Sequence, residues 1–187
     1  MENNSLMFSN KLRKKILDTA YHAGAKSAHI GGALSLADII SVLYSKGFIK
    51  YSKNPKWADR DRFILSKGHA CLAYYALLYL LNYLDEKDLE LFETDGAALL
   101  GHPIMNLDKG IEFSTGSLGM GLSIGIGQAI AALRKKKDYQ IYVIMGDGET
   151  NEGSVWEAAM AAPNFKLKNL NIIVDKNNYQ QTGSTEI

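Results

Sequence analysis

The sequence of 187 residues has one cysteine, three prolines and no long apolar run. The single Cys71 excludes an internal disulfide framework and suits a reducing compartment, so we expect a cytoplasmic protein. No apolar run approaches the ~20 residues that a membrane helix needs. The opening segment MENNSLMFSNKLRKK lacks the apolar core of a signal peptide. These shortages predict a soluble intracellular protein with no membrane partner.

A strong excess of charge is also missing, because 21 Lys and Arg residues stand against 20 Asp and Glu residues. A formal net charge of +1 provides no general field that would attract nucleic acid or an anionic membrane. The one basic run, RKKK at 134–137, ends a predicted helix, where cations offset the helix dipole. We therefore expect no nucleic-acid partner.

What the chain does contain is enough apolar sequence for one substantial core. With 47% hydrophobic residues and a length that is short for two domains, residues 1–187 are expected to form a single domain. Periodicity predicts helices over 10–24, 35–46, 70–84, 121–137 and 155–162, and strands over 62–68, 139–148 and 169–177. The first helix should bury Leu12, Ile16, Leu17 and Ala20. Ser35 is the candidate N-cap of the second helix, and Pro163 should follow the last one.

The order strand, helix, strand over 139–177 predicts a βαβ unit with parallel strands. Ligands of such sheets gather at the carboxyl ends of the strands. Asp147 follows the first of these strands, and Asn177 follows the second, 30 residues later. We therefore expect an α/β fold that places Asp147 and Asn177 at the same end of a parallel sheet.

Asp147 and Asn177 carry oxygen ligands of the kind that Mg²⁺ takes from proteins, with the remaining positions left to phosphates and water. Gly146 and Gly148 allow a tight turn, so that amides after Gly148 could bind phosphate oxygens beside the metal. The alternative is an ordinary strand-end turn, since GDG alone is a common triplet. The addition of Asn177 favours a magnesium ion that carries a diphosphate.

Three of the four histidines stand in glycine-associated loops: His29 in SAHIGGALS, His69 in LSKGHA and His102 in LLGHPI. Glycine beside histidine allows a ligand to approach the backbone, which a histidine of the core does not need. Each of them alone could be structural, but three in such settings predict contacts to a ligand. His22, within the first predicted helix, carries no such signal and is assigned a structural role.

Two rival ligands can be weighed from spacing. Zinc is disfavoured because the three histidines lie 40 and 33 residues apart, with no H-x-x-x-H or C-x-x-C pair. A dinucleotide is suggested by Gly125 and Gly127, followed 20 residues later by Asp147. That fingerprint fails because Ile130 occupies its third glycine position and a small-residue helix, not a strand, precedes Gly125.

The motifs taken together resemble the transketolase family. SAHIGGALS, LSKGHA, GHP, STGSLGMGLSIGIGQA and GDGETNEGSVWEAAMAA follow the family's order, and GDG with Asn177 resembles the thiamine diphosphate signature. The resemblance extends from about Lys11 to Gly183. It implies the thiamine diphosphate-binding fold, a parallel sheet with helices on both faces, shortened here at its C-terminal end.

The resemblance also implies ligands for a cofactor. Thiamine diphosphate and Mg²⁺ are expected, with the metal held by Asp147, Asn177 and the main-chain carbonyl of Tyr179. The diphosphate would be held by His69 and by the amides near Gly148 and Glu149. The aromatic rings of the cofactor would be lined by Gly116, Ser117 and Leu118.

For catalysis, the resemblance implies that His29 and His102 reach the substrate hydroxyls and shuttle protons. Glu152 matches an acid that lies at the family's dimer interface and couples to a cofactor-activating glutamate. The implied reaction transfers a two-carbon ketol unit from a ketose phosphate to an aldose phosphate. Sugar phosphates are thus the expected substrates.

Three departures accompany the resemblance. Ala28 stands where the family commonly has glycine, the last part of the diphosphate-binding domain is missing, and no pyrimidine-binding domain is present. The chain therefore resembles the N-terminal subunit of a transketolase divided between two polypeptides. Its expected partner is a C-terminal subunit with the pyrimidine-binding domain, in a hetero-oligomer. The alternatives are a non-catalytic remnant or scaffold, and another thiamine enzyme such as a deoxyxylulose phosphate synthase-like protein.

Overall fold

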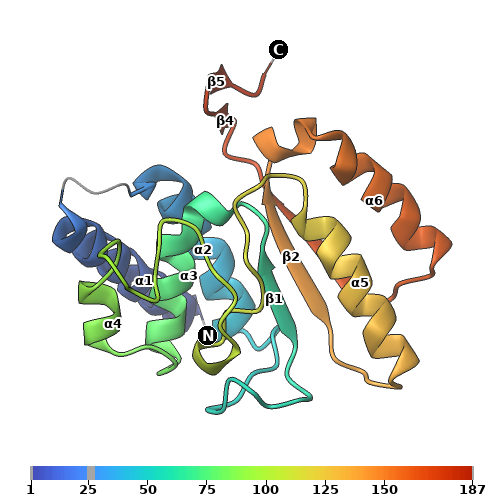
Figure 1. Cartoon of the computed structure of the whole chain (residues 1–187), viewed down its shortest axis with the longest axis horizontal. Coiled ribbons are helices and arrows are strands. Elements are labelled where there is room, and N and C mark those ends of the chain that lie inside the picture. The colour runs from blue at the N-terminus through green and yellow to red at the C-terminus, as the bar shows by residue number, and fades with distance from the viewer. Residues whose placement is uncertain (1, 25–27, 187) are drawn as a thin grey trace. The chain divides into compact units, whose positions relative to one another are not determined.

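Figure 1 shows the computed structural model of the chain, which describes residues 2–24 and 28–186. The chain divides into two compact units. The helical unit runs up to Trp57 and also contains Gly68–Ser114. The sheet unit comprises Ala58–Lys67 and the chain from Thr115 onward. The expectation of a single domain over 1–187 stays a prediction.

The helical unit is built from α1 (Glu2–Ala23), α2 (Ile30–Ser45), α3 (Cys71–Leu80) and α4 (Glu86–Glu90), with 3₁₀ turns at Gly68–Ala70 and Leu107–Lys109. Helix α1 packs against α2 and α3. It buries Leu12, Ile16 and Ala20, as predicted, whereas Leu17 is 49% exposed and does not belong to the buried face.

Helix α1 begins eight residues earlier than the sequence pattern predicted, at Glu2 instead of residue 10. Contacts with α2 account for the extra turns. The Ser41 hydroxyl donates to the Ser5 carbonyl, and the Ser9 hydroxyl donates to Asp38 at 2.6 Å. These partners lie more than 25 residues away in the sequence, so local periodicity could not reveal them.

Helix α2 also begins earlier than predicted, at Ile30, which places Ser35 inside the helix. The prediction of Ser35 as the N-cap is therefore wrong. His29 occupies the N-cap position and makes no side-chain capping bond. Because Gly31 and Gly32 have low helix propensity, the sequence pattern did not predict this first turn of α2.

Helix α3 was predicted as a buried helix, and its residues from Cys71 to Leu78 are all buried. Its tyrosines reach acceptors in the loop that follows α4: Tyr74 donates to the Gly110 carbonyl at 2.7 Å, and Tyr75 donates to the Leu100 carbonyl at 2.8 Å. Burial raises the pKa of the Cys71 thiol to about 12, which agrees with a packing role for this cysteine.

The sheet unit contains three parallel strands in the order β1 (Arg62–Leu65), β2 (Ile141–Gly146) and β3 (Leu170–Asp175). Helices α5 (Gly121–Arg134) and α6 (Gly153–Asn164), a 3₁₀ turn at Gly148–Asn151, and the short hairpin of β4 (Tyr179–Gln180) and β5 (Gly183–Ser184) complete it. The predicted α/β fold with a parallel sheet is thereby confirmed. So is the βαβ unit of β2, α6 and β3.

Helix α5 lies close against the sheet, and Gly125 makes the approach possible. A Cβ atom at Gly125 would lie 2.5 Å from Cγ2 of Val143, a buried residue of β2. Gly125 and Gly127 therefore lie within a helix and do not form the strand-to-helix turn of a dinucleotide site. Helix α6 runs beside α5 (Figure 1).

Helix α6 differs from prediction at its end, because Pro163 lies inside the helix and not after it. Proline has no N–H to donate to the carbonyl four residues before it, and its ring crowds that carbonyl, so a proline usually kinks or ends a helix. Here only Asn164 follows within the helix, and the amide of Phe165 still donates to the Ala161 carbonyl at 3.0 Å. The last turn therefore tolerates Pro163.

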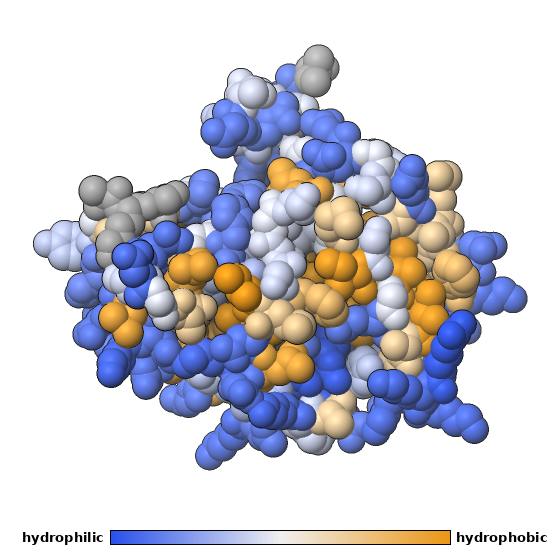
Figure 2. Space-filling model, viewed as in Figure 1, coloured by the Kyte–Doolittle hydropathy of each residue, from blue (hydrophilic) through white to orange (hydrophobic). Residues whose placement is uncertain are grey.

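Apolar side chains remain at the surface of the sheet unit. Figure 2 shows them over α5 and α6. The exposed fraction of Met160 in α6 is 70%, that of Trp156 is 62%, and that of Phe165 at the end of the helix is 52%. On β3, Ile172 and Val174 are 43% and 44% exposed.

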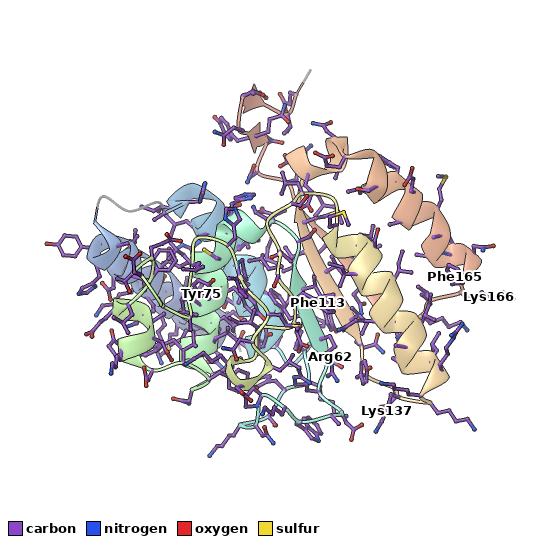
Figure 3. The ribbon with its side chains drawn as sticks, in the orientation of Figure 1. Arg62, Tyr75, Phe113, Lys137, Phe165 and Lys166 are labelled. Carbon is purple, nitrogen blue, oxygen red and sulfur yellow. The ribbon has the colours of Figure 1, made fainter. Side chains whose placement is uncertain are left out.

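The basic run at 134–137 lies at the amino end of the parallel strands. Figure 3 shows Arg62, where β1 begins, and Lys137, which precedes β2, at this end of the sheet unit. The Lys137 ammonium pairs with Asp59 at 2.7 Å. This end lies opposite the carboxyl ends of the strands, where a ligand is expected.

None of the helices in the described residues combines the length and the hydropathy that a membrane span requires.

Candidate functional site

The carboxyl ends of β2 and β3 meet at the pair Gly146 and Asp175. The Asp175 carbonyl accepts hydrogen bonds from the amides of Asp147 and Asn177, both at 3.2 Å. The main-chain amides of Asp147 and Asn177 therefore share one carbonyl oxygen as their hydrogen-bond acceptor. The prediction that Asp147 and Asn177 follow adjacent parallel strands at one end of the sheet agrees with this geometry.

The Asp147 carboxylate is half-buried and surrounded by hydrogen-bond donors. Its Oδ2 accepts from the Asn178 amide at 2.8 Å and from the Thr185 hydroxyl at 2.9 Å, and its Oδ1 accepts from the Gly148 amide at 3.1 Å. Partial burial raises the pKa of Asp147, but these donors outweigh it, with Thr185 first, so the pKa lies below its ordinary value. The charged form of the Asp147 carboxylate is thus favoured.

Asn177 is placed by a tight turn in the main chain. Asn178 has a φ of 63°, a left-handed conformation that asparagine tolerates better than most residues. The turn brings the Tyr179 amide to Oδ1 of Asn177 at 2.9 Å, so the side-chain oxygen faces Tyr179. The Tyr179 ring is 74% exposed. The predicted metal ligands Asn177 and Tyr179 therefore lie within the short segment that runs from the end of β3 to the first residue of β4.

The loop after Asp147 is closed by the β4–β5 hairpin. A Cβ atom at Gly148 would lie 2.7 Å from Cβ of Gln180, so only glycine lets these two segments approach. Among the described residues, no group of three or more His, Cys, Asp and Glu side chains could hold a metal ion. The predicted magnesium ligands include only one residue of these types, Asp147.

The predicted ring-lining residues, Gly116, Ser117 and Leu118, lie in the loop before α5. Thr115 begins this loop, and within the described residues its buried Oγ1 has no hydrogen-bond partner. Glu149 does not face the solvent, because its side chain is only 2% exposed and is hydrogen-bonded within the unit. Glu152, by contrast, is exposed at the start of α6 and makes no side-chain capping bond.

A buried ion pair in the sheet unit was missed by the sequence analysis. Lys67 Nζ lies 2.7 Å from Oδ2 of Asp175, and their side chains are 1% and 6% exposed. Lys67 follows β1, and Asp175 ends β3, so the pair joins two strands at their carboxyl ends. A lysine two residues after the apolar run RFIL was the available signal, since lysine is rarely buried without a partner.

The helical unit brings the three predicted histidines together. The rings of His29 and His69 have centroids 5.8 Å apart, and those of His29 and His102 are 5.9 Å apart. A Cβ atom at Gly32 would lie 3.1 Å from Cδ2 of His69, which explains why a glycine follows His29 so closely. His29 and His102 are exposed and His69 is half-buried, so all three are open to a ligand.

The helical unit also has a surface pocket of about 650 Å³ that contains none of the predicted residues. It is lined by residues of α3 and α4 and by Lys109, which pairs with Asp88 at 2.6 Å. The Asp88 amide also donates to Asp85 in a capping box. These polar groups of the pocket are thus paired with one another within the fold. The histidine cluster therefore remains the candidate site of this unit.

Among known protein families, residues 7–187 match the one described as "Transketolase, thiamine diphosphate binding domain". An apulose-4-phosphate transketolase subunit of Phocaeicola vulgatus is 43% identical over 178 residues, which are 95% of this chain and 62% of that protein. The 6-deoxy-6-sulfo-D-fructose transketolase subunit SqwG of a Clostridium species is 38% identical over 178 residues and is covered to 64%.

Among solved structures, transketolase from Leishmania mexicana superimposes with a TM-score of 0.86 at 34% sequence identity. The similarity covers 96% of this chain and 28% of that one. This chain thus spans less than two thirds of each of these two transketolase subunits and about a quarter of transketolases such as that of Rhodobacter capsulatus. The chain belongs to the transketolase family, of which it carries the thiamine diphosphate-binding domain.

Proposed function

We propose that this chain binds thiamine diphosphate with Mg²⁺ and serves as the N-terminal subunit of a two-chain transketolase. Its reaction is the transfer of a two-carbon ketol unit from a ketose phosphate to an aldose phosphate. The observation that carries the proposal is the convergence of Asp147 and Asn177 on the Asp175 carbonyl. The family membership supports the identity of the cofactor.

The residues at the strand ends fit a magnesium ion. Asp147 is an anion, Asn177 has a side-chain oxygen nearby, and Tyr179 offers a main-chain carbonyl in the same loop. Mg²⁺ accepts a few such oxygens and leaves the others to phosphate and water. In this proposal the Asn178 and Thr185 donors hold the Asp147 carboxylate in place for the metal.

The diphosphate would be held by His69 and by amides near Gly148 and Glu149. Thiamine diphosphate, when bound, supplies the electron sink for breaking a carbon–carbon bond beside a ketone. Gly116, Ser117 and Leu118 would contact its rings. The unpartnered Thr115 hydroxyl at the start of this loop supports a polar ligand there.

The substrate would be positioned by His29 and His102. Imidazole can both donate and accept a proton near neutral pH, which suits the handling of sugar hydroxyl protons. The exposure of both rings supports contact with a ligand from solution. His69, in contrast, would bind the phosphates of the cofactor.

A partner chain with a pyrimidine-binding domain would complete the enzyme. Relatives of this chain bear the name of a transketolase subunit, which supports a divided enzyme. Glu152 is exposed at the start of α6, as expected of a residue that reaches a partner's glutamate. We propose that the assembled hetero-oligomer acts in the cytoplasm.

Replacement of Asp147 tests the proposal. Asp147→Ala removes the only charged metal ligand, so the affinity for thiamine diphosphate in the presence of Mg²⁺ should fall at least about tenfold. Calorimetric titration of the cofactor, with and without Mg²⁺, measures this change. Circular dichroism should show that the fold persists.

Asp138→Ala is the matched control, because Asp138 is exposed at the opposite end of β2 and makes the same change in charge. It should bind the cofactor as the unaltered chain does. Equal affinities in the Asp147 and Asp138 variants would reject the metal assignment. Failure of the unaltered chain to bind the cofactor, also in the presence of its partner, would reject the proposed function.

A further inference from the structure

Glu149 is a buried carboxylate that the proposed reaction does not use. Its side chain is 2% exposed and lies within the sheet unit. Oε1 accepts the Ser66 hydroxyl and the Gly119 amide, the latter at 2.8 Å, and Oε2 accepts the Gly146 amide at 3.1 Å. A buried carboxylate is costly unless donors surround it, and here three donors do so.

The three donors come from three different segments. Ser66 follows β1, Gly119 lies in the loop before α5, and Gly146 ends β2. The Ser66 hydroxyl also accepts the Gly121 amide at 3.1 Å, which extends the network to the first residue of α5. One side chain thus joins two strand ends to the loop that contains Gly116, Ser117 and Leu118.

The geometry of this loop leaves no room for other residues at two positions. Gly119 has a φ of 83°, and a Cβ atom there would lie 2.5 Å from the Ser154 hydroxyl and 2.6 Å from Cβ of Glu152. A Cβ atom at Gly121 would lie 2.8 Å from Cα of Ser66. The Ser154 hydroxyl donates to the Gly119 carbonyl at 3.0 Å. Both main-chain polar groups of Gly119 are therefore held by the segment that follows Asp147.

We propose that Glu149 is a positioning residue that holds the 116–118 loop in register with Asp147 for cofactor binding. It would act through the main chain, by fixing Gly119 and Gly146, and would not touch the cofactor with its side chain. The inference rests on the proposed function, because the loop is assigned to thiamine diphosphate. It assigns Glu149 a second role beside its predicted amide contact.

Glu149→Gln tests the proposal with little change in volume. The glutamine side chain must direct its NH₂ group toward at least one of the three donors. One hydrogen bond is then replaced by an unfavourable contact between two donors. We expect at least about tenfold weaker binding of thiamine diphosphate with Mg²⁺. Amide hydrogen exchange of the cofactor-free chain should become faster at Gly119 or at Gly146, whichever main-chain amide then faces the new NH₂ group.

Val143→Ala is the control for general loss of stability. Val143 is a fully buried residue of β2, and its truncation leaves a cavity without touching the network. Both variants should melt at a lower temperature than the unaltered chain. Well below those temperatures, Val143→Ala should bind the cofactor within about twofold of the unaltered chain, because its loop contacts remain intact.

Each outcome of the experiment is informative. Equal losses of affinity in Glu149→Gln and Val143→Ala, or no loss in Glu149→Gln, would overturn the positioning role. Unchanged exchange at both Gly119 and Gly146 in Glu149→Gln would also overturn it, even if the unaltered chain binds no cofactor. Absence of cofactor binding by the unaltered chain, together with faster exchange in Glu149→Gln, would reject the proposed function and retain Glu149 as the residue that holds the loop.

Discussion

Asp147 illustrates how one residue serves both the fold and the candidate site. Its carboxylate caps the 3₁₀ turn through the Gly148 amide and holds the β4–β5 hairpin through Thr185. The same three donors lower its pKa and keep it charged. The proposed metal ion would therefore find a carboxylate whose position is already fixed by hydrogen bonds. The histidines are different, because they make contact with one another through their rings and stay open to ligands.

The proposed division of labour among the histidines is testable. His69→Ala should weaken thiamine diphosphate binding about tenfold, through loss of a hydrogen bond to a charged group. His102→Ala should leave that affinity nearly unchanged and lower kcat about 100-fold in the assembled enzyme, because it is assigned to the substrate.

His22→Ala is the control for both variants, because His22 is exposed in α1 and contacts the Asp18 carbonyl of its own helix. It should affect neither quantity. Titration calorimetry measures the affinities, and steady-state kinetics at saturating cofactor measures turnover. Equal loss of cofactor affinity in the His69 and His102 variants would contradict the assignment.

At the scale of elements, two kinds of contact hold the helices in place. In the sheet unit, α5 lies on β2 because Gly125 has no side chain at the point of closest approach. In the helical unit, α1 is linked to α2 by an ion pair of Arg13 with Asp38 at 2.7 Å, which Ser9 joins. The first contact is apolar and independent of pH, whereas the second depends on the charge of Asp38.

Gly125 and Gly127 form a matched pair of tests in α5. Gly125→Ala should destabilise the protein by about 1–3 kcal/mol, because its methyl group meets Val143, a residue that cannot move aside in a packed core. Gly127→Ala should stabilise it by about 0.5–1 kcal/mol, because Gly127 is exposed with nothing within 4 Å, and alanine is the better helix former. Urea unfolding measures both. Equal effects of the two changes would contradict the packing of α5 on β2.

The contact between α1 and α2 predicts a dependence of stability on acid pH. Hydrogen bonds from Arg13 and then Ser9 lower the pKa of Asp38 from 3.8 to about 2 in the folded chain. Its stabilising effect is therefore complete above pH 4 and is lost as the pH falls toward 2. The effect should be below about 1 kcal/mol, because the Asp38 side chain is 68% exposed.

Thermal melts of the unaltered chain and Asp38→Asn between pH 2 and pH 6 test this dependence. The unaltered chain should melt at the higher temperature at pH 6, and the difference should vanish near pH 2. Asp95→Asn changes the charge of another exposed aspartate in the same unit and is the control. A difference that stayed constant across the range would refute the Asp38 linkage.

In the molecule as a whole, the proposed ligands of cofactor and substrate are divided between the two units. The sheet unit contains the proposed metal ligands and the amides proposed to bind the diphosphate, and the helical unit contains the histidines proposed to bind the diphosphate and the substrate. In the proposed function, the partner chain supplies an acid on the pyrimidine side of the cofactor. The exposed Trp156 and Met160 of α6 are further groups that a partner could cover.

Mixing with a C-terminal transketolase subunit from the same genome tests this partnership. We expect a heteromeric complex by light scattering, and transfer between xylulose 5-phosphate and ribose 5-phosphate only in the mixture. Each chain alone is the control and should be inactive. Full activity of this chain alone would refute a divided enzyme, and a complex without activity would favour the scaffold alternative.

The sequence alone determined the features that are local or periodic. The βαβ unit could be predicted because β2 and β3 are apolar runs that end in turn residues, and parallel strands necessarily place Asp147 and Asn177 at one end. The three histidines could be singled out by their glycines. The early start of α2 at Ile30 could not, because its glycines are poor helix formers and only packing compensates for them.

Which polar groups are buried together depends on contacts between segments that are far apart in the sequence. Lys67 and Asp175 are 108 residues apart in the sequence, and Glu149 accepts from Ser66 and Gly119, which are 83 and 30 residues away. No local pattern specifies such partners, since burial of a charge becomes favourable only when the chain has brought its donors together. Residue types and spacing can thus propose a ligand, whereas the three-dimensional fold determines which side chains hold the surrounding loops.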